Sequence, residues 1–279
     1  MAHTLEQAIA AGADLLASSS ESAKLDAQVL LLHILKKPRS YLFTWPEHAL
    51  SDEQQSQFNV FIQRRLKGEP VAHITGLREF WSLSLEVNAT TLIPRPDTET
   101  LVEQALEIAL SATAKVLDLG TGTGAIALAL GSEMPSWQIT AVDRVSDAVA
   151  LATRNQQRLA INNVHVKQSN WFSELHGEKF NLIVTNPPYI ESSDIHLNQG
   201  DVRFEPLSAL VADDCGMSDI KQIITQSRDY LSSNGYLLIE HGFEQSEAVR
   251  HFFEKMAFVN IKTVKDLGNN DRVTLALWP

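Results

Sequence analysis

Asn186-Pro187-Pro188-Tyr189 combines a carboxamide, two prolines and an aromatic ring directly after a short apolar run. The run, Phe180 to Thr185, is typical of a buried strand, and the prolines would end it abruptly. At such a strand end, Asn186 and the proline carbonyls offer hydrogen-bond acceptors, and Tyr189 offers a flat face. These groups suit a planar ligand that carries an NH₂, although a turn after a core strand is the alternative interpretation.

A glycine-rich segment, Asp118-Leu119-Gly120-Thr121-Gly122-Thr123-Gly124, lies between a β-like run and a helical pattern. Glycines allow a ligand to approach the backbone closely, and a new helix presents free N–H groups. A Walker loop is excluded because this segment lacks the required lysine, whereas a dinucleotide fingerprint can be forced onto residues 122–127 and is kept as an alternative. S-adenosylmethionine is the third candidate. Asp118 favours it, because a carboxylate there would repel a pyrophosphate but suits a cationic amino acid.

Two further residues follow predicted strands and are candidates for the same ligand. Asp143 ends the run 139–143, where an acid can accept hydrogen bonds from both ribose hydroxyls. Capping of the next helix is the alternative role for Asp143, but Ser146 can provide that cap. Trp171 follows the third run and could stack on adenine or pack in the core.

The acid, the glycine loop and the tetrapeptide together resemble class I S-adenosylmethionine-dependent amino-methyltransferases. Over nearly its full length the chain resembles one family of that class, the release factor glutamine methyltransferases (PrmC/HemK). One departure is Asn170, where an acidic residue is expected; its amide can still hydrogen-bond the adenine amino group. The resemblance also rests on three other stretches: Arg95-Pro96-Asp97-Thr98-Glu99, Gly200-Asp201-Val202-Arg203-Phe204-Glu205-Pro206 and Asn270-Asp271-Arg272-Val273.

This resemblance implies methyl transfer from S-adenosylmethionine to the side-chain amide nitrogen (N5) of a glutamine. The target is the Gly-Gly-Gln motif of class I peptide chain release factors. We expect the Asn186 oxygen and the Pro187 carbonyl to accept the two amide N–H bonds, with Tyr189 packed against the amide plane. The implied roles are catalytic for Asn186, Pro187 and Tyr189; substrate-binding for these with Pro188, Arg95 and Glu205; and cofactor-binding for Asp118, residues 120–124, Asp143, Trp171 and Asn186, without a metal.

Three other functions remain open. The tetrapeptide also suits the exocyclic amine of a flipped base, so an N6-adenine methyltransferase acting on DNA or RNA is the main alternative. The second alternative is a non-catalytic regulator that binds S-adenosylmethionine or a nucleotide. The third is a dehydrogenase. Glu240 and His241 end a predicted strand nearby, and we interpret them as structural.

Composition favours a protein substrate. The chain of 279 residues has a formal net charge of −11, whereas proteins that grip nucleic acid usually present a basic face. Its single cysteine, Cys215, excludes an internal disulfide, and residues 1–6 lack the features of a signal peptide. We therefore expect a cytoplasmic protein with no membrane association and no stable nucleic-acid binding. We also expect it to be a monomer.

The first 72 residues predict a helical bundle that recognises the substrate. Capping boxes begin helices at Thr4 and Ser51, and the latter helix ends near Gly68. A helix between them, from about Ser22 to Leu35, has Leu25, Val29, Leu32 and Ile34 as core candidates. Arg64 and Arg65 form a basic cluster that we attribute to the preference of cations for a helix C-terminus.

Residues 73–90 predict a β-hairpin linker, with β-like pattern from His73 to Val87. Residues 91–279 predict the methyltransferase domain, with a helix that Asp97 or Thr98 caps and that reaches about Leu110. Strands and helices then alternate as in a doubly wound, mostly parallel α/β sheet of seven strands. The expected strands are 115–119, 138–142, 164–167, 180–185, 235–240, 259–265 and 272–277, the last two antiparallel; the expected helices are 125–133, 146–160, 219–231 and 245–255.

Overall fold

The computed structural model describes residues 4–279. Residues 1–3 lie outside the described part. The predicted helical domain and the segment examined for a signal peptide both begin with these residues. The chain forms two compact units. The first extends to Leu77 and also contains Asn198–Phe204; the second contains Arg78–Leu197 and Glu205–Pro279.

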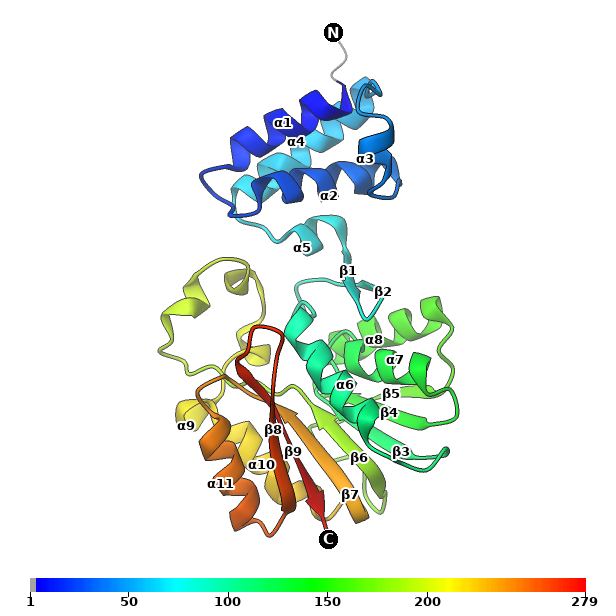
Figure 1. Cartoon of the computed structure of the whole chain (residues 1–279), viewed down its shortest axis with the longest axis vertical. Helices are drawn as coiled ribbons and strands as arrows, with labels where there is room; N and C mark the ends of the chain where they lie inside the picture. Colours follow the sequence, from blue (N-terminus) through cyan, green and yellow to red (C-terminus); the bar gives the residue numbers. More distant parts are fainter. Residues whose placement is uncertain (1–3) are drawn as a thin grey trace. The chain divides into compact units, whose positions relative to one another are not determined.

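The first unit is a helical bundle, as predicted (Figure 1). Capping boxes at Thr4 and Ser51 are present, and in each the side-chain oxygen accepts a backbone N–H from a glutamine three residues on. The helices pack around a core that includes Leu30, Leu31 and Phe58. The helices are α1 (Leu5–Leu16), α2 (Ala23–Leu35), α3 (Tyr41–Thr44), α4 (Asp52–Leu66) and α5 (Val71–Thr75).

The buried face of α2 differs from the prediction. Leu25 and Val29 are 46% and 39% exposed, whereas Ala27, Leu30 and Leu31 are completely buried. Apolar residues occur nearly all round this helix, so their spacing alone does not select one face. Tertiary packing against α1 and α4 makes the selection.

The hairpin is shorter than predicted. Its strands are β1 (Leu77–Phe80) and β2 (Leu83–Glu86). The prediction of β structure from His73 is wrong, because Val71–Thr75 forms α5. Gly76, at φ 71°, ends this helix in a left-handed conformation that favours glycine.

A seven-stranded sheet forms the centre of the second unit, and the predicted fold class is confirmed (Figure 1). Its strand order is β5-β4-β3-β6-β7-β9-β8, and only the pairings of β9 are antiparallel. The strands are β3 (Lys115–Leu119), β4 (Gln138–Asp143), β5 (Val164–Gln168), β6 (Phe180–Thr185), β7 (Leu231–Glu240), β8 (Val259–Lys265) and β9 (Asp271–Trp278).

Helices cover both faces of this sheet. Side chains alternate along each strand, so Val116 joins the core under α6 and α7, and Leu117 joins the core under α10 and α11. The predicted helix 219–231 ends earlier, at Ser227, because β7 already begins at Leu231. The helices are α6 (Glu99–Glu107), α7 (Ala125–Glu133), α8 (Ser146–Leu159), α9 (Asp213–Gly216), α10 (Ser218–Ser227) and α11 (Ser246–Lys255), with 3₁₀ turns η1 (Pro96–Thr98), η2 (Ile195–Asn198), η3 (Val202–Phe204) and η4 (Leu207–Ala209).

Candidate active site

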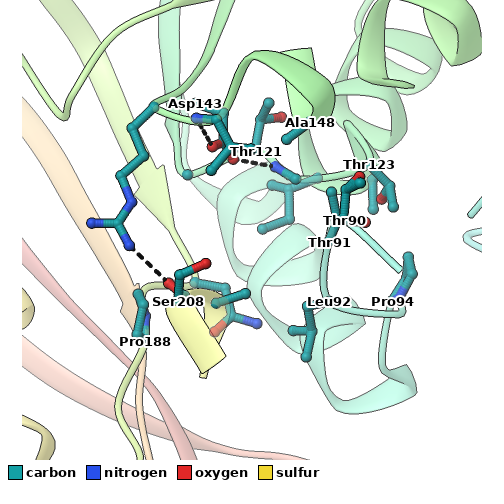
Figure 2. Close-up of a pocket in the computed structure, with 18 of the residues that line it drawn as sticks. Thr90, Thr91, Leu92, Pro94, Thr121, Thr123, Asp143, Ala148, Pro188 and Ser208 are labelled. Carbon is teal, nitrogen blue, oxygen red and sulfur yellow. Dashed lines mark hydrogen bonds between the residues drawn. The ribbon is translucent and has the colours of Figure 1, made fainter. Parts of the chain in front are cut away.

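A pocket lies at the carboxyl ends of the central parallel strands, where α/β sheets commonly bind ligands (Figure 2). Gly120 follows β3, Asp143 ends β4, Asn170 follows β5, and Asn186 follows β6; all four line the pocket. The structure thus brings together candidates that are far apart in the sequence. Those that line it are Arg95, Gly120, Thr121, Gly122, Thr123, Asp143, Trp171, Asn186 and Pro188.

The glycine loop has the backbone that its composition predicts. Gly120, Gly122 and Gly124 have φ angles of 70°, 54° and 86°. A β-carbon on Gly120 would lie 3.3 Å from the Trp171 ring, and one on Gly124 would lie 3.0 Å from Leu128. Glycine therefore provides both the left-handed conformations and the space for neighbouring side chains.

Asp118 lies beneath this loop and is not among the residues that line the pocket. Its Oδ2 accepts the Thr121 hydroxyl at 2.6 Å and the Ala127 N–H at 3.3 Å. Burial raises the pKa of Asp118 to about 7, against the effect of these hydrogen bonds. The carboxyl group joins the loop to α7, and its role towards a ligand stays a prediction.

Asp143 lines the pocket and organises two backbone segments. Its Oδ2 accepts the Gly122 N–H at 3.0 Å, and its Oδ1 accepts the Val145 N–H at 2.9 Å (Figure 2). The prediction that Ser146 caps the next helix is wrong, since α8 begins at Ser146 without a side-chain cap. Each carboxylate oxygen keeps a second lone pair, so Asp143 can still accept from a ligand hydroxyl.

Trp171 and Asn170 form another part of the pocket lining. Trp171 has a φ of 49°, and its backbone carbonyl accepts the Ser169 hydroxyl at 2.7 Å. Burial raises the pKa of Asp219, which also lines the pocket, while the charge of Arg144 and, to a lesser degree, the Trp171 side chain act in the opposite direction.

The tetrapeptide contributes two of its four residues to the pocket lining, Asn186 and Pro188. Pro187 is buried. Tyr189 points its hydroxyl towards β7 and donates to Glu240 Oε1 at 3.5 Å. Neither Pro187 nor Tyr189 is among the lining residues, and their catalytic roles stay predictions.

Arg95 and Glu205 contact each other. Arg95 Nη2 lies 2.7 Å from Glu205 Oε2, and Glu205 Oε1 accepts the Ile93 N–H at 3.0 Å. Arg95 lines the pocket, whereas Glu205 supports the segment that forms this wall. Their predicted role in substrate binding is not tested by this geometry.

Several lining residues were not predicted. Thr90, Thr91 and Leu92 come from an irregular segment in which no periodic pattern marks a site. Arg144 donates to the Ser208 carbonyl at 3.2 Å across the pocket (Figure 2). For Arg144 a sequence signal exists, because it directly follows the acid at the end of β4.

Thr98 also lines the pocket, although we expected it to cap a helix. It occupies the N-cap position of α6, but its side chain makes no capping hydrogen bond. Its Oγ1 instead accepts from Asn186 Nδ2 at 3.2 Å. The prediction of a helix-capping side chain at this position is therefore wrong for Thr98.

Within residues 4–279, no group of three or more His, Cys, Asp or Glu side chains could hold a metal ion. The helices of the same region are all too short or too polar to cross a membrane.

Two family descriptions match this chain: "PrmC N-terminal domain" at residues 7–76 and "Methyltransferase small domain" at residues 96–203. Among solved structures, a methyltransferase from Pyrococcus furiosus has a TM-score of 0.55 at 16% identity, covering 77% of this chain and 96% of that chain. The hMettl16 catalytic domain, solved with a MAT2A 3′UTR hairpin, has a TM-score of 0.58 at 17% identity, covering 75% of this chain and 79% of that chain. These similarities show the fold.

Similarity to curated proteins is much higher. The release factor glutamine methyltransferase of Shewanella oneidensis is 60% identical over 94% of this chain and 92% of its own length. The Escherichia coli protein of the same name is 56% identical over 93% of this chain and 94% of its own length. The chain therefore belongs to the release factor glutamine methyltransferase family.

Proposed function

We propose that this protein transfers a methyl group from S-adenosylmethionine to N5 of the glutamine in the Gly-Gly-Gln motif of class I peptide chain release factors. The observation that carries this proposal is a single pocket lined both by the glycine loop and by Asn186. One cavity can thus hold a methyl donor and an amide acceptor side by side. The names of the relatives support the choice of release factors.

The pocket residues fit S-adenosylmethionine. Asp143 has lone pairs left for ribose hydroxyls, and the backbone of Gly120–Gly122 can be approached closely. Trp171, Val145 and Ala148 provide apolar surface for a purine, and Asn170 provides an amide beside it. When bound, S-adenosylmethionine supplies a methyl group that its sulfonium already activates.

Asn186 and Pro187 would prepare the acceptor nitrogen. An amide nitrogen is a poor nucleophile, because its lone pair is delocalised into the carbonyl. The Asn186 side-chain oxygen and the Pro187 carbonyl accept its two N–H bonds, which orients the nitrogen and favours the positive charge that develops on it. No general base is needed before transfer, since the proton can leave to water afterwards.

The helical unit would bind the body of the release factor while the catalytic unit receives the Gly-Gly-Gln loop. Phe43 and Trp45 in this unit are 73% and 58% exposed, as expected for a surface that binds a protein. The double variant Phe43→Ser, Trp45→Ser should raise KM for intact release factor and leave S-adenosylmethionine affinity within about twofold.

We also propose that the protein acts as a cytoplasmic monomer.

Mass spectrometry of release factor after incubation with labelled S-adenosylmethionine tests the proposal. We expect one added methyl group on the Gly-Gly-Gln glutamine, and none with Asn186→Ala. That variant should still bind S-adenosylmethionine, because Asn186 mainly serves the acceptor. DNA, RNA and lysate protein are the parallel substrates; methylation of adenine, or of none of these, would contradict the proposed function.

A further inference from the structure

Asn186 is held from behind by a side chain of another element. Thr98, at the start of α6, is 4% exposed, and its Oγ1 accepts from Asn186 Nδ2 at 3.2 Å. Its side chain makes no capping hydrogen bond to the helix. The hydroxyl is therefore used across the fold, on the carboxamide that we expect to meet the substrate.

Glu240 lies behind this pair at the end of β7. It is 1% exposed, and its Oε1 accepts from the Tyr189 hydroxyl at 3.5 Å. Its Oε2 is also buried and has no hydrogen-bond partner within the described residues. Burial raises the pKa of Glu240 to about 7, and the nearby Thr98 side chain is the largest opposing influence. Thr98 thus accepts from Asn186 and keeps its own hydroxyl proton, while the buried Oε2 of Glu240 is an acceptor without a partner within the described residues.

Three stretches that carry the family resemblance meet at this point. Thr98 comes from 95–99, and Asn186 and Tyr189 come from 186–189. Arg272 comes from 270–273; it lies 3.7 Å from Asp97, and its charge acts on both Tyr189 and Glu240. Because these stretches are remote in sequence, their meeting at a buried carboxylate indicates one shared task.

The number of protons that the Thr98 hydroxyl can donate indicates what this task is. A threonine hydroxyl has a single proton to donate. If Thr98 donates to the Glu240 carboxylate, it can only accept from Asn186, so the Asn186 NH₂ faces Thr98. The Asn186 oxygen then faces away from Thr98. Without Glu240 as acceptor, Thr98 could donate to that oxygen, and the carboxamide could turn over.

We propose that Thr98 and Glu240 are positioning residues that set the orientation of the Asn186 carboxamide, so that its oxygen meets the N–H bonds of the substrate amide. This inference rests on the proposed function for its substrate. The chain Asn186 to Thr98 to Glu240 needs no ligand to form, so its orientation can be measured in the free protein.

The first experiment measures kcat and KM for release factor methylation in full-length variants. Thr98→Val keeps the shape and removes the hydroxyl; we expect kcat to fall about 10- to 100-fold, with KM for S-adenosylmethionine changed less than about twofold. Thr98→Ser restores the hydroxyl and should recover most of the loss. Glu240→Gln can donate to Thr98 and so reverse the direction of the hydrogen bonds from Asn186 through Thr98. This variant should lower kcat over the same range.

Thr100→Val is the matched control. Thr100 is a buried threonine in the same helix and does not line the pocket. Equal kcat values for Thr98→Val and Thr100→Val, or no recovery in Thr98→Ser, would overturn the inference. Thermal unfolding of every variant separates loss of fold from loss of orientation. If Thr98→Val does not fold, the kcat of Glu240→Gln tests the inference in its place, and an unchanged kcat would overturn it.

A second experiment does not depend on the substrate. In ¹⁵N-labelled free protein, the Asn186 side-chain NH₂ should show a nuclear Overhauser contact with the Thr98 methyl group, and Thr98→Ser should keep the amide shifts. Absence of this contact would overturn the positioning role. Its presence in a protein that methylates no glutamine would instead reject the proposed function and leave the arrangement of Asn186 supported.

Discussion

At the scale of single residues, Asp143 shows how one side chain can serve structure and ligand together. Its two oxygens accept the N–H groups of Gly122 and Val145, which belong to the loops after β3 and β4. The carboxylate therefore joins two walls of the pocket before any ligand binds. A hydroxyl pair of S-adenosylmethionine would use the remaining lone pairs of a group that is already fixed.

Asp143→Ala should accordingly affect affinity and local stability at once. We expect S-adenosylmethionine to bind roughly 10- to 100-fold more weakly, since ligand hydrogen bonds to the charged group are lost. Asp143→Asn keeps one acceptor oxygen and should lose less. Calorimetry of both variants measures this difference, and an unchanged affinity in Asp143→Ala would reduce Asp143 to a structural residue.

Residue types predicted which side chains line the pocket better than they predicted which side chains hold those residues in place. Asp143, the glycines and Asn186 were identified because each follows a recognisable strand. The sequence predicts that Asp97 or Thr98 caps a helix, because a threonine before a helix has the same appearance whether its hydroxyl bonds locally or across the fold. Only the position of Asn186 in space distinguishes these two uses.

At the scale of elements, the end of α4 is held by an ion-pair cluster. The Arg65 side chain is 12% exposed; its Nε lies 2.7 Å from Asp26 of α2, and its Nη1 lies 2.9 Å from Asp201. Nη1 also donates to the Glu69 carbonyl at 3.1 Å. Our interpretation of Arg65 as a helix-end cation is therefore incomplete, because its main partners come from two other segments.

Arg65→Ala should destabilise the first unit by about 3 kcal/mol, because Asp26 would remain buried without its cation. Asp201→Ala should cost less, since the Asp201 side chain is 39% exposed. Thermal and urea unfolding, followed in both variants and in Arg39→Ala at an exposed arginine, would measure these costs. An Arg65→Ala protein as stable as Arg39→Ala would contradict the role of the cluster.

At the scale of the whole molecule, two buried carboxyl groups link stability to pH. Burial raises the pKa values of Asp118 and Glu240 from 3.8 and 4.5 to about 7. The folded state then binds more protons than the unfolded state between those values. The stability that both groups contribute is fully present below about pH 4 and is lost as pH rises through about 7.

We therefore expect the free energy of unfolding to decrease between about pH 5 and pH 7, with a slope of up to about 1.4 kcal/mol per pH unit for each group. The double variant Asp118→Asn, Glu240→Gln should flatten this slope. Urea unfolding at several pH values provides the measurement. The same slope in the double variant would show that other groups cause the dependence.

The alternation of strands and helices predicted the sheet and its parallel centre, because each buried central strand is a short apolar run. The antiparallel edge was predicted because no helix separates the last two strands. The assignment of Asn198–Phe204 to the first unit was not predictable in this way. That segment contains only short 3₁₀ turns, and its ion pair with Arg65 depends on distant residues. Local pattern carries no information about such a partner.

The first unit is built from two separate stretches of the chain, and this affects how related proteins can be recombined. The chain passes between its two units at residues 77/78, 197/198 and 204/205. A hybrid made by joining the first 77 residues of one relative to the remainder of another would separate Arg65 from its native Asp201. Recombinants that exchange 198–204 together with the amino-terminal part should therefore be more stable than recombinants that split the two segments.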